Sequence, residues 1–216
     1  MVAGRWDPGL YLVTDQALAG DRSVQEIVGA ALRGGVTMVQ LREKERDTRS
    51  FVALAQQLGA ELRSRGVPLI INDRLDVALA AGASGVHIGQ QDMPYGQARR
   101  ILGPEAIIGL SVETLEQAEE AEQLDCDYLG VSPIFPTPTK TDVGTSWGLE
   151  GLRTLRRRSA KVLVAIGGIN ADNAAAVLDA GADGIAVVSA ICASREPEAA
   201  ARALWQTIQR HRRRSP

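Results

Sequence analysis

The chain has 216 residues, which is long enough to form one large hydrophobic core. It is 45% hydrophobic and 23% charged with a net charge of −2, a balance typical of a soluble globular protein that offers no basic surface for nucleic acid. No apolar run approaches the roughly 18 residues that cross a bilayer, and no basic and then apolar leader opens the chain, so we expect no membrane span and no signal peptide.

Eight short apolar segments predict strands along the chain. They are rich in Val, Ile and Leu, as expected for strands buried on both faces of a parallel sheet. In chain order they are "GLYLVTD" (9–15), "VTMVQLRE" (36–43), "PLIIND" (68–73), "GVHIG" (85–89), "AIIGLSV" (106–112), "YLGVSPIF" (128–135), "VLVAIGGI" (162–169) and "GIAVVSA" (184–190).

Helical patterns separate these strands, for example over 23–35, 114–125 and 172–182. Ser23 is predicted to cap the first of these helices, and Glu26 completes the spacing of a capping box. Thr114 is predicted to cap the second. The basic segment "RHRRRSP" (210–216) is interpreted as a solvated helix end, where arginines suit the negative pole of the helix dipole.

A partial repeat supports this alternation. "RGGVTMVQLRE" (33–43), "AGASGVHIG" (81–89), "LDCDYLGVSP" (124–133) and "AGADGIAVVS" (180–189) share a helix end, a small or acidic turn and a strand. Eight strands alternating with helices predict a (β/α)8 TIM barrel, and a doubly wound open sheet is the alternative. No linker divides the chain, so we expect a single TIM-barrel domain over residues 1–216.

In such a barrel the chemistry takes place at the carboxyl ends of the strands and in the loops that follow them. Nearly every predicted strand delivers polar groups there. In chain order they are Thr14 and Asp15; Gln40, Arg42 and Lys44; Asn72 and Asp73; Asp92; Ser111; Thr137, Pro138, Thr139 and Lys140; Gly167 and Gly168; and Val188 and Ser189.

Gln40, Arg42 and Lys44 alternate along one predicted strand, so their side chains are expected to share a face. Two cations on one face suit a phosphate or diphosphate. Asp73 and Asp92 follow neighbouring strands and either form structural ion pairs or hold Mg²⁺. The nearby cations favour Mg²⁺ bound together with a diphosphate, because this ion prefers one or two carboxylates plus phosphate oxygens.

A second anion site is expected at the ends of the last two strands. Barrels commonly hold a phosphate monoester there, through backbone N–H groups and a helix N-terminus. Gly168 allows the backbone to approach closely, and Ser189 supplies a hydroxyl and an N–H. In the loop "SPIFPTPTKTDVG" (132–144), two prolines stiffen a segment that presents two threonines and Lys140, which suits a bound anion.

No serine, cysteine or histidine is recognisable as an activated nucleophile. His87 is expected to be a hydrogen-bonded group inside the barrel. Cys126 and Cys192 match no metal spacing and are expected to be small buried side chains. Two such cysteines fit a reducing compartment, so we expect a cytoplasmic protein. The sequence does not indicate an oligomeric state.

Four motifs in this order resemble the thiamine-phosphate synthase family: "VQLREK" (39–44), "INDRLDVALAAGASGVHIGQQDMP" (71–94), "YLGVSPIFPTPTKTD" (128–142) and "AIGGIN" (165–170). The resemblance runs from about Leu10 to Ser194. It implies a (β/α)8-barrel transferase that uses Mg²⁺. The implied reaction joins 4-amino-2-methyl-5-hydroxymethylpyrimidine diphosphate to a thiazole phosphate, by a dissociative mechanism, and gives thiamine phosphate and diphosphate.

The resemblance also implies roles for the matched residues, with two phosphorylated small molecules as the partners. The implied pyrimidine-diphosphate contacts are Gln40, Arg42, Lys44, Asn72, Ser111 and Lys140. The implied thiazole-phosphate contacts are Thr137, Pro138, Thr139, Gly168, Val188 and Ser189, and the implied Mg²⁺ ligands are Asp73 and Asp92. Ser132 and Glu113 depart from the pattern of many relatives, but neither belongs to the implied diphosphate or metal set.

Three other functions remain open from the residues. A thiazole tautomerase would act on the thiazole phosphate alone and would not need the diphosphate and metal residues. A non-catalytic sensor of phosphorylated ligands could use the same barrel. Another phosphosugar enzyme would need a paired acid and base or a Schiff-base lysine inside a strand, and Lys161 lies at the wrong end of its strand for that role.

Overall fold

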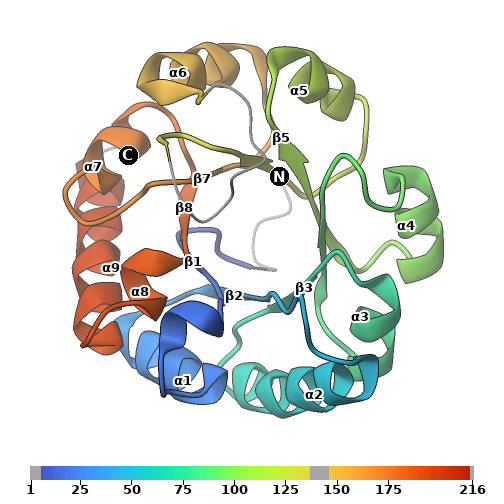
Figure 1. The fold of residues 1–216 in the computed structure, drawn as a ribbon. Helices are drawn as coiled ribbons and strands as arrows, with labels where there is room; N and C mark the ends of the chain where they lie inside the picture. Colours follow the sequence, from blue (N-terminus) through green and yellow to red (C-terminus); the bar gives the residue numbers. More distant parts are fainter. Residues whose placement is uncertain (1–5, 137–145, 215–216) are drawn as a thin grey trace.

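A computed structural model describes residues 6–136 and 146–214 as an eight-stranded parallel barrel surrounded by helices (Figure 1). The strands are β1 (Leu10–Val13), β2 (Met38–Leu41), β3 (Leu69–Asn72), β4 (Gly85–Ile88), β5 (Ile107–Val112), β6 (Tyr128–Val131), β7 (Leu163–Ile166) and β8 (Gly184–Val187). Each strand pairs in parallel with its sequence neighbours, and β1 pairs with β8, Leu10 lying opposite Ile185. The predicted barrel is confirmed, and the open-sheet alternative is wrong because the first and last strands join.

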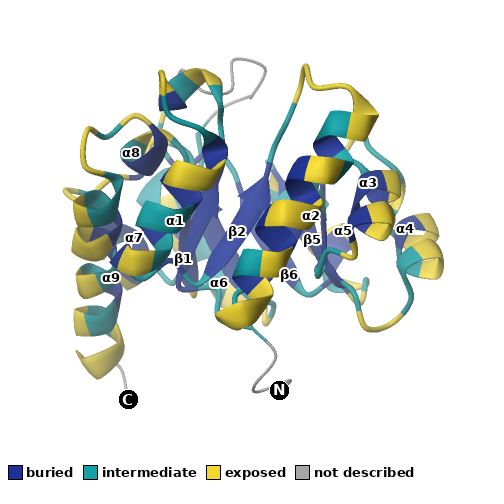
Figure 2. Cartoon of the chain, turned by 90° about the horizontal axis from the view of Figure 1, so that it is seen from below, coloured by how far each residue is buried: buried dark blue, intermediate teal, exposed yellow. Residues whose placement is uncertain are grey.

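The helices lie outside the barrel with their buried sides toward the strands (Figure 2), and these sides contribute apolar residues to the core. They are η1 (Ala17–Ala19), α1 (Val24–Gly34), α2 (Thr48–Ser64), α3 (Leu75–Ala81), α4 (Tyr95–Leu102), α5 (Leu115–Glu122), α6 (Gly148–Arg158), α7 (Ala174–Asp179), α8 (Ser189–Cys192) and α9 (Pro197–Arg214). The capping box of Ser23 and Glu26 is confirmed, as is the cap by Thr114. None of the helices in this part of the chain combines the length and the apolarity of a membrane-crossing segment.

Two separate apolar layers stabilise the fold. The larger one lies between the strands and the surrounding helices and includes both cysteines, which are free and buried as expected. The smaller one fills the interior of the barrel. Its buried members are Tyr11, Val13, Met38, Ile70, Ile107, Tyr128, Val164 and Ala186. The interior of the barrel is therefore a packed core and not an open channel.

One polar contact recurs four times at the amino ends of the strands. The residue just before each even-numbered strand donates its backbone N–H to the carbonyl of one residue in the preceding strand. Its side-chain oxygen accepts the backbone N–H of that same strand residue. The pairs are Thr37 with Leu10, Ser84 with Leu69, Asp127 with Ile108 and Asp183 with Leu163, with side-chain distances of 3.0, 3.2, 2.8 and 2.8 Å. This contact gives the repeat seen in the sequence a physical basis, because it satisfies a backbone donor at the start of each odd-numbered strand.

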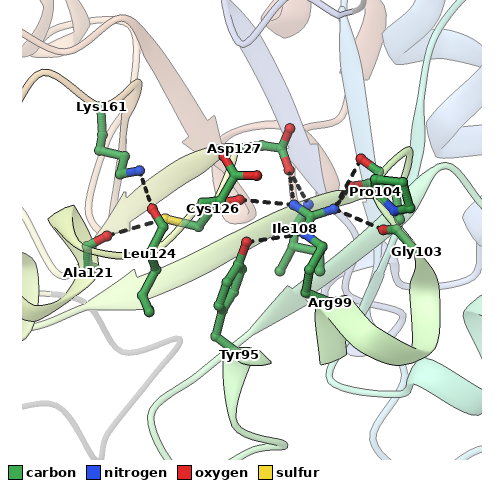
Figure 3. Close-up of polar contacts among 12 residues, drawn as sticks. Tyr95, Arg99, Gly103, Pro104, Ile108, Ala121, Leu124, Cys126, Asp127 and Lys161 are labelled. Carbon is green, nitrogen blue, oxygen red and sulfur yellow. Dashed lines mark hydrogen bonds and ion pairs between the residues drawn. The ribbon is translucent and has the colours of Figure 1, made fainter. Parts of the chain in front are cut away.

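Arginines hold two of these four anchors in place. Arg99 on α4 donates to Asp127 at 2.9 Å and to the carbonyl oxygens of Gly103 and Ala106 at 3.1 and 2.7 Å (Figure 3). Arg156 on α6 likewise donates to Asp183 at 2.9 Å. Lys161 lies just before β7, and its amino group donates to the carbonyl of Leu124 near the first of these clusters (Figure 3). As expected, this lysine lies at the end of the barrel away from the predicted site.

The basic end of α9 makes specific contacts instead of being only solvated. Arg212 donates to Asp7 at 2.9 Å and lies over the ring of Trp205, with 5.5 Å between the guanidinium carbon and the ring centre. His211 contacts Asp179 on α7 at 3.0 Å. These contacts fasten the last helix to the segment before β1 and to α7. The sequence interpretation missed them because they join residues far apart in the chain.

Candidate active site

A cavity of about 350 Å³ opens at the carboxyl ends of the strands. Its lining contains every predicted site residue that the structure describes: Gln40, Arg42, Lys44, Asn72, Asp73, Asp92, Ser111, Gly168, Val188 and Ser189. Thr137, Pro138, Thr139 and Lys140 lie outside the described residues. The barrel thus brings together residues that are more than 140 positions apart in the sequence, as expected from their places at strand ends.

The expectation that Gln40, Arg42 and Lys44 share one strand face is wrong for the two cations. Strand β2 ends at Leu41, so Arg42 and Lys44 belong to the loop that follows it. Only Gln40 lies in the strand, where it is buried and points into the barrel interior toward Tyr11. The side chains of Arg42 and Lys44 still line the same cavity, because the loop that carries them begins where the strand ends, at the rim of the cavity.

The end of β1 positions Arg42. The guanidinium of Arg42 contacts Asp15 at 3.3 Å, and the N–H of Arg42 donates to the hydroxyl of Thr14 at 3.1 Å. Asp15 also accepts the N–H of Leu18 at 3.2 Å, which fixes its carboxylate. Thr14 and Asp15 were predicted at the rim. In the structure they are not among the lining residues of the cavity and instead hold Arg42, which is. This arrangement holds a cation at the cavity while leaving other N–H groups of the guanidinium available to a ligand.

Asp73 and Asp92 come together at the rim beside β3 and β4. The backbone N–H of Gly89 donates to Asp92 at 2.7 Å, which fixes one of its oxygens. Asp73 has a φ of 61°, a left-handed conformation that is uncommon outside glycine. Burial and the neighbouring carboxylate of Asp92 raise the pKa of Asp73 to about 6, against the opposing effect of Arg42.

This pair of carboxylates fits a magnesium ion. Burial and the neighbouring carboxylate both disfavour the charge on Asp73 and raise its pKa, and a divalent cation between the two carboxylates would offset both effects. Within residues 6–136 and 146–214, no third carboxylate, histidine or cysteine joins them in a ligand cluster. Mg²⁺ commonly takes only one or two carboxylates and completes its coordination with water and phosphate oxygens.

The opposite side of the cavity is built from the ends of β7 and β8. Gly167 and Gly168 have φ values of 104° and 67°, and a Cβ atom on Gly168 would lie 2.8 Å from the Cβ atom of Phe135. Only glycine fits this turn. The side-chain amide of Asn173 donates to the carbonyl of Gly168 at 2.9 Å. Val188 precedes the short helix α8, which begins at Ser189 on the cavity wall.

Arg22 anchors helix α8 from behind, a role that the sequence interpretation missed. Its guanidinium donates to the carbonyl oxygens of Cys192 and Ser194 at 3.0 and 2.6 Å. Gln16 donates to the carbonyl of Arg22 at 3.0 Å, so the loop after β1 and the segment after β8 form one unit. Arg22 lies just before α1, and no rule based on strand ends would have selected it.

A chain of hydrogen bonds crosses the floor of the cavity. It joins Gln40 on β2, Tyr11 on β1, Tyr128 on β6, His87 on β4 and Ser111 on β5. His87 is thus the hydrogen-bonded interior group that was expected. The two tyrosines were missed, because in the sequence they read as ordinary members of apolar strands. Burial raises the pKa of each tyrosine hydroxyl above the ordinary pKa of tyrosine, so both hydroxyls are protonated.

The two departures from the family pattern both lie at the cavity. Ser132 and Glu113 are among the lining residues, and the backbone N–H of Glu113 donates to Oε1 of Gln117 at 2.7 Å. Both residues therefore lie at the cavity, although the family resemblance assigns neither of them to a ligand or to the metal.

The fold and the cavity together define a (β/α)8-barrel protein with a polar site at the carboxyl ends of its strands. A family model described as thiamine monophosphate synthase matches residues 10–191. The chain belongs to this family. The resemblance found in the sequence is confirmed, and with it the prediction of a transferase of the thiamine-phosphate synthase type.

Similar proteins agree with this assignment. A thiamine-phosphate synthase from Albidiferax ferrireducens is 61% identical over 199 residues, which cover 92% of this chain and 91% of the relative. One from Syntrophomonas wolfei is 53% identical over 205 residues, which cover 95% and 98%. The solved structure of a thiamine phosphate pyrophosphorylase from Pyrococcus furiosus is 40% identical and superposes with a TM-score of 0.88, covering 96% of this chain and 98% of that one.

Proposed function

We propose that the enzyme condenses 4-amino-2-methyl-5-hydroxymethylpyrimidine diphosphate with a thiazole phosphate to give thiamine phosphate and diphosphate. The observation that carries the proposal is a single cavity with two differently built ends. One end has two carboxylates beside Arg42 and Lys44, and the other has the glycine turn and Ser189. A diphosphate suits the first end and a phosphate monoester the second, so both reactants would share one space.

Asp73 and Asp92 would hold Mg²⁺ at the first end. When bound there, the ion would supply positive charge to the diphosphate oxygens. Arg42 would add a fixed cation, oriented by Asp15 and Thr14, and Lys44 a second one. Asn72 and Ser111 would contribute neutral hydrogen-bonding groups from β3 and β5. All of these groups stabilise negative charge on the leaving diphosphate.

The proposed reaction is dissociative. The C–O bond between the pyrimidine methylene and the diphosphate breaks first, and the bonding electron pair leaves with the diphosphate. The ring nitrogen of the thiazole then donates its lone pair to the cationic methylene carbon and forms the C–N bond. The thiazole nitrogen carries no proton, so the reaction requires no general base, in agreement with the absence of a recognisable activated nucleophile in the sequence.

Lys140 belongs to this proposal through the family resemblance alone, because it lies outside the described residues. Its charge would act mainly on the leaving diphosphate as the C–O bond breaks. K140A should then slow single-turnover formation of thiamine phosphate more than it weakens binding of the pyrimidine diphosphate. K140R should rescue only in part, since a planar guanidinium does not occupy the position of a compact ammonium group.

The proposed function is tested by incubating the protein with both substrates and measuring thiamine phosphate and diphosphate in equal amounts. Omitting either substrate, or removing Mg²⁺ with a chelator, should abolish both products. Turnover of the thiazole phosphate alone would instead identify a tautomerase, and binding without turnover would identify a sensor. We also propose a cytoplasmic location, supported by the two free and buried cysteines.

A further inference from the structure

The hydrogen-bond chain on the floor of the cavity has continuous geometry, and all five of its members line the cavity. Gln40 Nε2 lies 2.9 Å from Tyr11 Oη, and Tyr11 Oη lies 2.9 Å from Tyr128 Oη. Tyr128 Oη lies 3.0 Å from His87 Nδ1, and His87 Nε2 lies 2.8 Å from Ser111 Oγ. All four contacts fall within ordinary hydrogen-bond distances. The chain connects Gln40 on β2 with Ser111 on β5, two residues that the family resemblance assigns to the pyrimidine diphosphate, through β1, β6 and β4.

Its middle members have fixed positions. Tyr11 and Tyr128 are fully buried, and the ring of Tyr128 stacks on His87 with 5.5 Å between ring centres and 24° between planes. Gly130 packs against the Cε1 edge of the imidazole, because a Cβ atom there would lie 2.7 Å from Cε1. The imidazole is therefore held between the ring of Tyr128 and the backbone of β6. Both of its ring nitrogens are committed to the two partners named above.

The number of protons sets the direction of the chain. Each tyrosine hydroxyl has one proton to donate. Tyr11 accepts from the amide of Gln40, so the proton of Tyr11 goes to Tyr128. Tyr128 then gives its own proton to His87 Nδ1. A neutral imidazole that accepts at Nδ1 carries its proton at Nε2, and this N–H donates to Ser111 Oγ.

We infer that His87 is a positioning residue that turns the hydroxyl proton of Ser111 into the cavity. Because Ser111 Oγ accepts from His87, its own proton remains available for an anion in the cavity that it lines. If the hydrogen bonds of the chain pointed in the opposite direction, Ser111 would donate its proton to His87 Nε2. Its hydroxyl could then present only lone pairs to the anion. The inference rests on the proposed function in one respect, that the anion at Ser111 is a diphosphate.

The direction of the chain can be measured without any substrate. The sequence contains two histidines, His87 and His211, so the ring-nitrogen NMR signals of a protein labelled with ¹⁵N-histidine are assigned by comparison with H211Q. We expect His87 to be neutral and protonated at Nε2. A proton at Nδ1, or protons at both ring nitrogens, would overturn the inference.

Two matched variants test which hydroxyl controls this tautomer. Y128F and Y11F each remove one buried hydroxyl and keep the ring. Y128F removes the donor to Nδ1, so His87 should shift toward the tautomer protonated at Nδ1. In Y11F the buried proton of Tyr128 has no acceptor left in the chain other than His87 Nδ1, so the tautomer protonated at Nε2 should be kept. The same tautomer in Y128F and wild type would contradict control by Tyr128.

The consequence for binding is measured by titrating inorganic diphosphate into the protein in buffer with Mg²⁺. Losing one hydrogen bond to a charged group weakens binding on the order of tenfold to a hundredfold, and we expect this loss in both S111A and Y128F. If Tyr128 acts through Ser111, the double variant should bind no more weakly than S111A alone. Independent, multiplying losses would overturn the relay. Unweakened binding by S111A would overturn the assignment of Ser111 to the diphosphate, whereas the proposed function itself is decided by turnover of both substrates, and the tautomer result would stand on its own.

Discussion

Asp73 and Asp92 face each other at the rim of the cavity, and burial together with this like-charged neighbour raises the pKa of Asp73 to about 6. Asp73 also has a left-handed backbone conformation, with a φ of 61°. Both features cost stability, which is typical of residues retained for function. Removing the charge at this position should therefore stabilise the protein while it lowers activity.

The first prediction concerns the stability of D73N without divalent cations. The folded-state pKa of Asp73 is raised from 3.8, so the native chain binds this proton more tightly than the unfolded chain does. The resulting destabilisation of wild type is absent below about pH 4 and fully present above about pH 6. Near neutral pH, D73N should be more stable by on the order of 1 kcal/mol, after allowance for solvent screening. Asparagine also tolerates the left-handed backbone.

Urea unfolding of both proteins across the pH range measures this difference. D76N is a suitable control, because the neighbouring Arg74 lowers the pKa of Asp76. That control should show no gain in stability at neutral pH. A D73N variant no more stable than wild type at neutral pH would contradict the repulsion between the two carboxylates.

The second prediction concerns the metal. D92N keeps an oxygen that can accept the N–H of Gly89 but removes the negative charge. Activity should fall by roughly a hundredfold or more and should require higher Mg²⁺ concentrations, since a weaker ligand replaces a carboxylate. The melting temperature should change little. Normal turnover of D92N at low Mg²⁺ would rule out the assignment of Asp92 as a metal ligand.

The third prediction separates the two ends of the cavity. S189A should weaken binding of the thiazole phosphate by about tenfold to a hundredfold and leave binding of the pyrimidine diphosphate nearly unchanged. S111A should show the reverse pattern, so each variant is the control for the other. Calorimetric titration with each substrate measures both effects. Equal weakening of both substrates in either variant would contradict the division into two ends.

The fourth prediction concerns Arg22, which holds the end of α8 and the segment after it through the carbonyl oxygens of Cys192 and Ser194. R22A should raise the KM for the thiazole phosphate more than the KM for the pyrimidine diphosphate, because α8 carries Ser189. R22K should restore part of the loss through one of the two bonds. R33A is a control, since Arg33 makes an exposed ion pair with Glu198. Equal changes in both KM values would indicate a general loss of stability instead.

The fifth prediction concerns the base of the barrel. R99M removes the guanidinium that joins Asp127 to the loop before β5, and it should lower the free energy of unfolding by about 2–4 kcal/mol. Both KM values should stay unchanged, because Arg99 lies away from the cavity lining. The exposed neighbour provides the control R100M, which should lose little. A comparable loss in both variants would mean that the contacts of Arg99 are not specific.

The arrangement of the barrel could be predicted from the sequence because each local signal had one meaning. Short apolar runs rich in branched residues alternated with capped helices, and both predicted caps formed. Strand ends were less certain. Arg42 and Lys44 continue an alternating pattern past Leu41, but periodicity cannot show where the ladder stops. The four repeated anchors explain why similar residues precede the second, fourth, sixth and eighth strands in the sequence.

The site was predictable where a polar side chain lay at the end of a strand. It was not predictable where a residue acts through another residue. Arg22 influences the cavity through α8, and Tyr11 and Tyr128 through a chain of hydroxyl groups. Their partners lie far away in the sequence, and their neighbours along the chain give no sign of them. Such supporting residues become visible only when distances between side chains are known.

The ion pair between Asp7 and Arg212 has a practical consequence. Asp7 precedes β1, so the pair lies at the amino ends of the strands, on the face of the barrel opposite the cavity. Residues near the two extremes of the described chain therefore meet on the face of the barrel away from the cavity. A peptide joining them would need to be only short, and the circularised chain could be reopened in an exposed helical turn with the order of strands around the barrel unchanged. Such circular permutants should retain the cavity, and surface attachment through this face should leave its mouth open to substrates.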